Sequence, residues 1–349
     1  MTHDELHPAN HLATIAPRIL AALNTPAGHI SALRILRHKP GRRALIAYTL
    51  EIPQAPPQTI LGKLRVKSVD KHGYTIQRAL WQQGFTLPNL SVPEPLAILP
   101  AERLWLQRQV PGRPATELLN PHSPPALWAD IGRAIAALHH SHIPTTRRWN
   151  IEDELTLLHD RLHKAAAIHP ELATRIHALI APTTALAETL HHRPVCGIHR
   201  DCYPDQNLVD GAHLYWLDLD LYSEGDPALD VGNYLAHIQE HALRHHGDLA
   251  AYAAQERALH NAYLSANPTA ADPTAIAAWT TLSLARHIYL STQFPDRRHS
   301  ASVYPLPLSP PAKTDYKPHN PCDEHPGTQV SSRLVTARVP SIYHAWWAQ

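Results

Sequence analysis

The segment 199–220 constrains the fold of this 349-residue chain more than any other part of the sequence. It begins directly after residues 195–198, a short apolar run that predicts a buried strand. Its second half holds two short apolar runs on either side of Asp210 and Gly211, and an Asp-Gly turn between such runs is a strong signal of a β-hairpin. The hairpin ends at Asp218, so we expect that acid to lie beside the polar loop that follows the first strand.

Three polar side chains of this segment should therefore come together. Asp201 follows the first strand, an amide comes at Gln206 or Asn207, and Asp218 ends the hairpin. A carboxylate in the first position can accept the proton of a substrate hydroxyl, whereas amide and carboxylate oxygens suit Mg²⁺ bound to nucleotide phosphates. A His-Arg-Asp triplet followed by an amide and a later acid is the pattern of kinase catalytic loops. The segment thus predicts Mg²⁺- and ATP-dependent phosphoryl transfer to a hydroxyl, with Asp201 as the catalytic base.

The sequence leaves the metal ligands beside Asp218 partly open. Counting five residues from Asp201 gives Gln206, and the next residue is Asn207. We favour Gln206, because its amide offers the same carbonyl oxygen on a longer arm, and we keep Asn207 as the alternative. Asp220 is either a further metal ligand or the alternate residue of the strand, which points away.

Three other residues should support this loop. We expect the ring of His199 to hydrogen-bond the backbone near Asp218, with a general-base role as the alternative. Asp226 and Asp230 stand at the start of an expected helix. An acid there caps free backbone N–H groups and is placed to brace the catalytic loop, which we favour over a role in catalysis.

Residues 28–112 should form a small lobe of five strands with one helix packed on it. The strands are expected at 30–37, 44–50, 59–66, 95–99 and 104–109, and the helix at 70–83 with Trp81 toward the core. Lys63 on the third strand either reaches nucleotide phosphates or is an exposed lysine that alternates with Arg65 and Lys67. The basic turn 37–43 either covers the phosphates or is solvated.

After residue 113 the apolar period becomes helical, which predicts a larger, mainly helical lobe over 113–297. Ser123 should cap its first helix. Further helices are expected at about 151–168, 171–192, 228–246, 249–265 and 273–291. Residues 1–27 form a lead-in with a short helix at about 10–23, and the Pro-rich residues 298–349 predict a poorly ordered tail.

The composition restricts the class of protein. The 31 basic residues nearly balance the 30 acidic ones, so no general attraction to nucleic acid or a membrane surface is implied. No apolar run approaches the roughly 18 residues that a membrane helix needs, and residues 1–5 do not begin a secretory signal. The three cysteines, Cys196, Cys202 and Cys322, show no paired spacing. We therefore expect a soluble, cytoplasmic protein.

Histidine is unusually frequent, with 28 residues in the chain. His237, His241 and His245 recur every four residues, which places them on one helix face near Glu240. Such spacing can serve metal ligation. The alternative that we favour is a weakly basic helix face exposed to solvent.

Segments 199–207, 216–220 and 225–233 resemble the aminoglycoside phosphotransferase and choline kinase-like superfamily of small-molecule kinases. The likeness extends over about 28–295 and is strongest around the catalytic loop. The resemblance implies an α+β, bilobal protein-kinase-like fold, with a small five-stranded antiparallel N-lobe and a larger, mainly helical C-lobe. It also implies that ATP and Mg²⁺ are used to phosphorylate a hydroxyl of a small polar metabolite held between the catalytic loop and the second lobe.

Carried over by position, the resemblance implies roles for particular residues. Asp201 would be the catalytic base, and Gln206 (or Asn207) and Asp218 would hold the metal. Lys63 would contact the phosphates. The connection after the fifth strand, including Val110 and Gly112, would touch adenine as a hinge.

Three departures from the family pattern motivate a second hypothesis. Gln206 stands where Asn is usual, the helix at 70–83 has no Glu to pair with Lys63, and the turn at 38–42 has a single Gly. The alternative function is therefore a degenerate kinase-fold protein that acts as a nucleotide sensor or binding scaffold without turnover. A protein kinase is a third reading, which the absence of Phe-Gly after Asp218 and of a later Ala-Pro-Glu segment disfavours.

Overall fold

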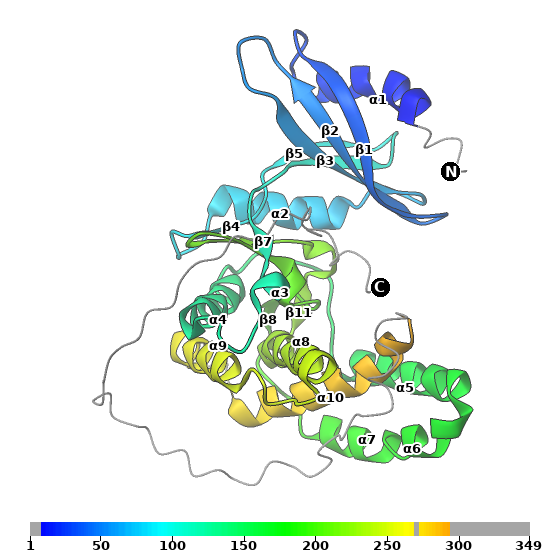
Figure 1. Ribbon diagram of the computed structural model, residues 1–349, viewed down its shortest axis with the longest axis vertical. Helices are drawn as coiled ribbons and strands as arrows, with labels where there is room; N and C mark the ends of the chain where they lie inside the picture. Colours follow the sequence, from blue (N-terminus) through cyan, green and yellow to red (C-terminus); the bar gives the residue numbers. More distant parts are fainter. Residues whose placement is uncertain (1–7, 269–271, 294–349) are drawn as a thin grey trace.

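The computed structural model describes residues 8–268 and 272–293, and these form two lobes (Figure 1). A twisted sheet with two helices makes up the N-terminal lobe, and a bundle of helices with short strands makes up the C-terminal one. This arrangement confirms the predicted α+β, bilobal fold. The predicted disordered tail at 298–349 lies outside the described residues.

The N-terminal lobe contains the predicted five-stranded antiparallel sheet. Its strands are β1 (His29–Lys39), β2 (Arg43–Glu51), β3 (Gln58–Arg65), β5 (Pro95–Leu99) and β6 (Leu104–Arg108), in the order β1-β2-β3-β6-β5. The turn around Gly41 closes the first hairpin with a left-handed φ of 68°, a conformation that glycine adopts without steric cost. Alternating apolar residues of these strands form one buried core under the sheet.

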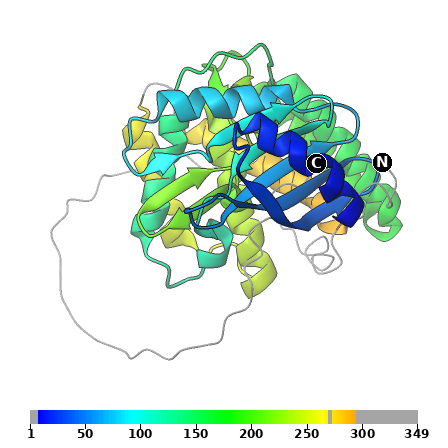
Figure 2. The same ribbon diagram turned by 90° about the horizontal axis from the view of Figure 1, so that it is seen from above.

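Two helices contact this lobe, where the sequence predicted one. Helix α1 (Pro8–Ala22) packs on one face of the sheet, which Figure 2 shows from above. Ile15 and Ile19 are buried in the core of the sheet, and His11 Nε2 lies 3.0 Å from the Tyr48 hydroxyl. The segment that we expected to be a lead-in is therefore part of the packed lobe.

Helix α2 (Lys71–Gln83) lies between the sheet and the helical lobe (Figure 1). Asp70 caps it by accepting a hydrogen bond from the Gly73 N–H at 3.1 Å. Ile76 and Leu80, four residues apart, bury themselves in the core of the helical lobe. The prediction that Trp81 faces a core was wrong: its side chain is 46% exposed, because it lies about 100° around the helix from Leu80.

The helical lobe contains most of the helices that were predicted. Its helices are α3 (Ala115–Leu118), which was not predicted, α4 (Pro125–His139), α5 (Ile151–Ile168), α6 (Ala173–His177), α7 (Ile180–Glu188), α8 (Pro227–His246), α9 (Ala253–Ala266) and α10 (Pro273–Thr292). The single helix expected over 171–192 is instead a 3-10 turn followed by α6 and α7. Pro182 explains the break, because it has no N–H to donate to the carbonyl of Ala178 and its ring crowds that carbonyl.

Ser123 does not cap α4, contrary to the prediction. Helix α4 begins at Pro125, and its N-cap residue Pro124 makes no side-chain cap hydrogen bond. The Ser123 hydroxyl instead donates to the Asn120 carbonyl at 2.8 Å and accepts from Trp128 Nε1 at 3.2 Å. Local closure of the preceding turn and the buried indole thus take the hydroxyl away from the free N–H groups of the helix.

Short strands hold the segment 199–220, which contains the predicted catalytic loop, at the junction of the lobes. The predicted hairpin is confirmed as β9 (Asn207–Asp210) and β10 (His213–Trp216), with Gly211 at φ 59° in its turn. It lies in a four-stranded sheet with β4 (Leu90–Ser91) and β7 (Arg113–Pro114). Strand β8 (Cys196–Ile198) pairs separately with β11 (Ser223–Gly225).

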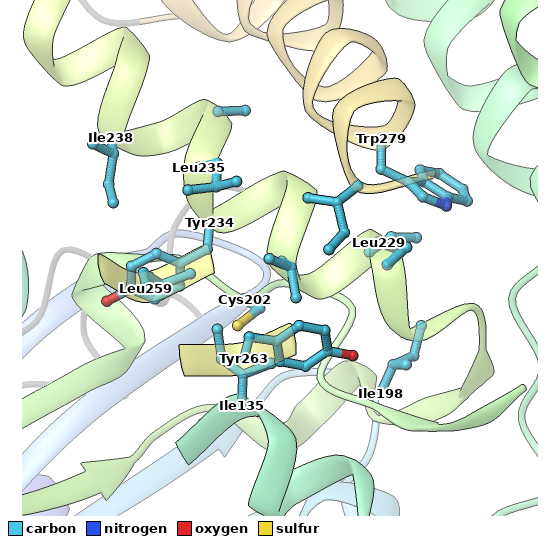
Figure 3. Packing of buried hydrophobic residues seen from close by; sticks show 14 of the residues in the cluster. Ile135, Ile198, Cys202, Leu229, Tyr234, Leu235, Ile238, Leu259, Tyr263 and Trp279 are labelled. Atoms are coloured by element: carbon cyan, nitrogen blue, oxygen red, sulfur yellow. The ribbon is translucent and has the colours of Figure 1, made fainter. Parts of the chain in front are cut away.

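The predicted catalytic loop packs on buried apolar residues of the helical lobe through Cys202 (Figure 3). The Cys202 side chain is fully buried there, and burial raises the pKa of its thiol, so it behaves as an inert apolar group. Residues labelled around it are Ile135, Ile198, Leu229, Tyr234, Leu235, Ile238, Leu259, Tyr263 and Trp279. No helix of the described ranges is long and apolar enough to cross a membrane.

Candidate active site

Asp230 holds the start of the catalytic loop through its backbone. Its two carboxylate oxygens accept the N–H groups of His199 and Arg200, each at 2.7 Å. Arg200 has a left-handed φ of 69°, which is uncommon for a residue with a side chain. His139 Nε2 contacts the same carboxylate at 3.0 Å, and His139 Nδ1 lies 3.0 Å from the Tyr263 hydroxyl. A buried chain of polar groups thus fixes the strained residue immediately before Asp201.

The ring of His199 joins this loop to the hairpin. Its Nε2 donates to the carbonyl of Leu217 at 2.8 Å, directly before Asp218 in the chain. The ring is fully buried and packs on Trp216 with a centroid separation of 5.4 Å. This is the backbone contact that the sequence suggested.

Asp201 and Gln206 lie together at the end of the loop. Gln206 Nε2 is 3.5 Å from Asp201 Oδ2, and the Leu217 N–H donates to the Gln206 carbonyl at 2.8 Å. The Gln206 side chain is fully buried, and within the described residues its Oε1 has no hydrogen-bond partner. Burial raises the pKa of Asp201, although the charges of His199 and Arg286 oppose the shift.

Asn207 takes a different position from Gln206. It is the first residue of β9 and stands opposite Trp216 in the antiparallel register, so the two side chains share one face of the hairpin. Its amide is fully buried, with no hydrogen-bond partner in the part of the chain that the structure describes. Of the two amides, Gln206 contacts the carboxylate of Asp201.

Asp218 meets Lys63 across the two lobes. Lys63 Nζ lies 3.2 Å from Asp218 Oδ1, and their side chains are 7% and 12% exposed. Asp218 has left-handed backbone angles (φ 53°, ψ 57°), which Asp tolerates better than most residues. Burial and the neighbouring charge of Asp220 raise the pKa of Asp218, and Lys63 opposes that rise.

Lys63 is a buried residue, so the reading of an exposed strand lysine was wrong. Its ammonium lies 5.0 Å from the centroid of the Trp105 ring, within the range of a cation–π contact. Burial alone would lower the pKa of Lys63, but Asp218 and Asp220 outweigh it and raise that pKa. The lysine therefore stays charged at the junction between the sheet and the hairpin.

Asp220 lies in a 3-10 turn, η4 (Leu219–Leu221), and does not continue the strand. Its carboxylate forms an ion pair with Arg65, and its Oδ1 is 3.5 Å from Lys63 Nζ. Burial opposes ionisation of Asp220, but Lys63 and Arg65 outweigh it and lower its pKa. The side chain thus does not point away but lies between Lys63 and Arg65.

Two polar residues at α2, Gln77 and the N-cap Asp70, bond to partners other than Lys63. Gln77 donates to the carbonyl of Pro93 at 2.7 Å and to Gln107 Oε1 at 3.1 Å. Asp70 pairs with Arg65 at 3.2 Å. The acids that pair with Lys63, Asp218 and Asp220, follow β10 in the chain.

Asp226 holds the first turn of α8. It accepts the N–H of Ala228 at 2.9 Å as the N-cap residue. Its second carboxylate oxygen accepts Trp279 Nε1 at 2.7 Å, which ties α8 to α10. Within the described residues Asp226 contacts α8, α10 and Arg193, whereas Asp230 makes the bracing contacts with the loop that starts at His199.

The expected hinge connects β6 to β7. Gly112 has a φ of +113°, and a Cβ there would lie 2.9 Å from the Val209 carbonyl oxygen on β9. Glycine thus permits close backbone contact between the hinge and the hairpin. Val110 is half-buried in the same connection, and Figure 1 shows β7 where the lobes meet.

Comparisons with known proteins show the family of this chain. The sequence model of the Phosphotransferase enzyme family matches residues 72–273, more than half of the chain. The chain belongs to this phosphotransferase family. No curated protein sequence matches it.

Solved structures show the same fold. The choline/ethanolamine kinase family protein from Mesorhizobium loti has a TM-score of 0.54 at 16% identity, covering 86% of this chain and 91% of that one. The Plasmodium vivax ethanolamine kinase has a TM-score of 0.55 at 14% identity, with coverage of 86% and 87%. A glucosamine kinase in complex with glucosamine, ADP and inorganic phosphate has a TM-score of 0.55 at 17% identity, with coverage of 82% of each chain. At these identities, the likeness establishes a protein-kinase-like fold for this phosphotransferase family member.

Two cations, for which the sequence predicted no role there, lie around the acids of this phosphotransferase family member. Arg43 stands opposite Arg65 in the register of β2 and β3. Burial lowers the pKa of Arg43, and the charges of Asp218 and Asp220 oppose this, so its guanidinium lies in the field of both acids. The sequence signal for Arg65 was the two-residue period of side chains along a strand, which puts Arg65 on the same face as Lys63. The tip of the basic turn, residues 40–42, is exposed, whereas Arg43 is half-buried.

The histidines of α8 form ring contacts. His237 stacks on Tyr203 at a centroid distance of 4.4 Å, and His241 stacks on His245 at 3.9 Å. Within the described residues, no group of three or more His, Cys, Asp or Glu side chains is arranged to hold a metal ion. The metal-site reading of this helix face was therefore wrong.

Proposed function

We propose that this protein is a small-molecule kinase that transfers the γ-phosphoryl group of ATP to a hydroxyl of a small polar metabolite. The observation that carries the proposal is the convergence of Asp201, Gln206 and Asp218 at the ends of two adjoining loops, with Lys63 at 3.2 Å from Asp218. Family membership supports phosphoryl transfer as the reaction class. Nucleic acid and membranes are not proposed as partners, since charge is nearly balanced over the chain.

The residues present fit a magnesium ion. The buried Gln206 Oε1 has no partner among the described residues, and Asp218 supplies carboxylate oxygens one loop away. Amide and carboxylate oxygens are hard ligands that Mg²⁺ accepts together with phosphates and waters. We propose Gln206 and Asp218 as the ligands. Asn207 lies opposite Trp216 in the β9–β10 pairing, and its side chain is on the same face of the hairpin as that of Trp216. When bound, the ion would neutralise charge on the transferring phosphates.

Each protein group then has a definite task. Asp201 takes the proton of the acceptor hydroxyl, and its burial makes it a stronger base than a solvated Asp. Lys63 neutralises non-bridging phosphate oxygens from the β3 side. Asp230 and His199 hold the two loops in register, so that base and metal ligands remain at their places. The connection with Val110 and Gly112 is proposed as the adenine contact.

Calorimetry of the purified full chain tests the proposal first. AMP-PNP should bind more tightly with Mg²⁺ than without it, and Asp218→Asn should abolish that difference. A panel of hydroxylated metabolites, with ADP release as readout, should then identify an acceptor whose turnover falls by about 10²–10⁴ in Asp201→Asn.

Asp210→Asn provides a matched control, because Asp210 is an exposed acid in the hairpin turn of the same segment. It should behave as the wild type in both assays. Absence of nucleotide binding by the wild type would overturn the kinase proposal in favour of a scaffold. Binding of nucleotide with no transfer to any acceptor class would favour a nucleotide sensor.

A further inference from the structure

We infer that Asp220 is a positioning residue that holds the phosphate-binding Lys63, in place of an acid on helix α2, and that it does not ligate the metal. The inference deepens the proposed function and rests on it. It assigns different tasks to two acids that are only two residues apart in the chain.

The first observation is the pair of contacts around the lysine. Lys63 Nζ lies 3.2 Å from Asp218 Oδ1 and 3.5 Å from Asp220 Oδ1, and both Lys63 and Asp220 are 7% exposed at their side chains. A metal ion bound to Asp218 weakens the attraction between that carboxylate and the Lys63 ammonium, because both cations share its negative charge. The second acid therefore keeps the buried ammonium compensated.

The second observation is the anchoring of Asp220. Arg65 forms ion pairs with Asp220 and with Asp70, the latter at 3.2 Å, and Asp70 is the N-cap of α2. Lys63 and Arg65 lie two residues apart on β3, on one face of the strand. Asp220 thus bridges two cations of the sheet, and Arg65 links it to the first turn of the helix.

The third observation is the close packing of this turn on α2. A Cβ on Gly73 would lie 2.7 Å from Asp220 Oδ1 and 2.7 Å from Asp70 Oδ2, so only glycine leaves room for both carboxylates. His72 Nε2 contacts the Tyr222 carbonyl at 2.8 Å, and Arg147 Nη1 donates to the Asp220 carbonyl at 2.6 Å. The turn η4 is therefore held against the first turn of α2, a helix that has no acid paired with Lys63.

The two possible tasks of Asp220 predict opposite results. A positioning residue supports Lys63 whether or not metal is present, so Asp220→Asn should weaken AMP-PNP binding without Mg²⁺ by about tenfold and retain the gain in affinity on adding Mg²⁺. A metal ligand would show the reverse, with unchanged metal-free affinity and loss of the gain. Asp218→Asn serves as the ligand reference, and Asp210→Asn as the control that changes neither quantity.

A second measurement reads the lysine directly, without nucleotide. The wild type and variants are treated with an acetylating ester, and the rate of acetylation of Lys63 is followed by peptide mass spectrometry relative to that of the exposed Lys164. Removal of a neighbouring carboxylate favours the neutral, reactive amine. Asp220→Asn should therefore speed the labelling of Lys63 several-fold, and Asp220→Glu should restore slow labelling.

Thermal melting checks that each variant is folded. Should Asp220→Asn fail to fold, Gly73→Ala provides a second test with every charge retained, because its Cβ would crowd the carboxylates of both Asp220 and Asp70. Unchanged Lys63 labelling and unchanged metal-free affinity in a folded variant would overturn the inference. Failure of the wild type to bind AMP-PNP would instead reject the kinase proposal, and the labelling result would still decide whether Asp220 holds Lys63.

Discussion

At the scale of single residues, the environment of Asp201 predicts the pH dependence of the reaction. Burial raises the pKa of this carboxyl above the ordinary value for Asp, although His199 and Arg286 oppose the shift. A base acts in its deprotonated form, so kcat/KM should be full at pH values above the raised pKa and fall as the pH drops through it. The acid limb should thus lie above the pKa of about 3.9 that a solvated Asp shows.

The pH profile is measured by ADP release with the identified acceptor, on wild type and Asp210→Asn in parallel. Both should give the same limb. A limb at or below the solvated value, or an unchanged rate in Asp201→Asn, would rule out this carboxyl as the base.

Asp230 is expected to matter for stability as well as for catalysis. Its carboxylate accepts two backbone N–H groups at 2.7 Å and contacts His139 at 3.0 Å, all away from solvent. An Asn amide can accept through one oxygen only and turns an NH₂ group toward an N–H. Asp230→Asn should therefore lower the free energy of unfolding by about 1–3 kcal/mol in urea titrations. A loss no larger than that of Asp210→Asn would show that other contacts hold the loop.

At the scale of elements, the contact of α4 with α9 depends on one glycine. A Cβ on Gly132 would lie 2.3 Å from the backbone carbonyl oxygen of Leu259, and that oxygen cannot move without shifting α9. Gly132→Ala gains up to about 1 kcal/mol of helix propensity but should lose about 1–3 kcal/mol through overpacking. The measured Tm should fall. Arg133→Ala, an exposed change in the same helix, is the control, and a rise in Tm for Gly132→Ala would mean that the helices separate at little cost.

Elements were predicted well where their signals are local. The hairpin β9–β10 followed from its Asp-Gly turn, and the strands of the sheet from their apolar alternation and Pro-Gly turn. Errors arose where one residue had competing partners or interrupted a pattern. The Ser123 hydroxyl bonds the Asn120 carbonyl and the indole of Trp128 instead of capping the free N–H groups of α4, and Pro182 divided an apparently continuous helical pattern.

In the candidate site, too, the features with local sequence signals were the ones that could be predicted. Asp201, Gln206 and Asp218 are within one short segment, so their convergence was readable from spacing. The pairing of Arg65 with Asp220 spans 155 residues and depends on how the sheet docks on the helical lobe. No sequence pattern in a single chain specifies that docking, and the substitute for the missing helix acid therefore emerged only from the structure.

At the scale of the whole molecule, the two lobes meet through the groups that the proposed nucleotide site uses. Lys63 belongs to the sheet, whereas Asp218 follows the hairpin of the helical lobe, and β7 and β9 connect the hinge to that hairpin. A ligand that binds the folded state at 100 times its Kd stabilises it by about 2.7 kcal/mol. Because the nucleotide would contact both lobes, this stabilisation should be shared between them.

Amide hydrogen exchange measures how the stabilisation is distributed. With AMP-PNP and Mg²⁺ at that concentration, the slowest amides of β3 and of β9–β10 should exchange about 100-fold more slowly together. Asp218→Asn should lose most of this protection in both places, whereas Asp210→Asn should retain it. Protection confined to β3 would mean that nucleotide is held by the sheet alone. In that case the acids of the hairpin would not take part in binding, and the two-lobed site proposed above would be wrong.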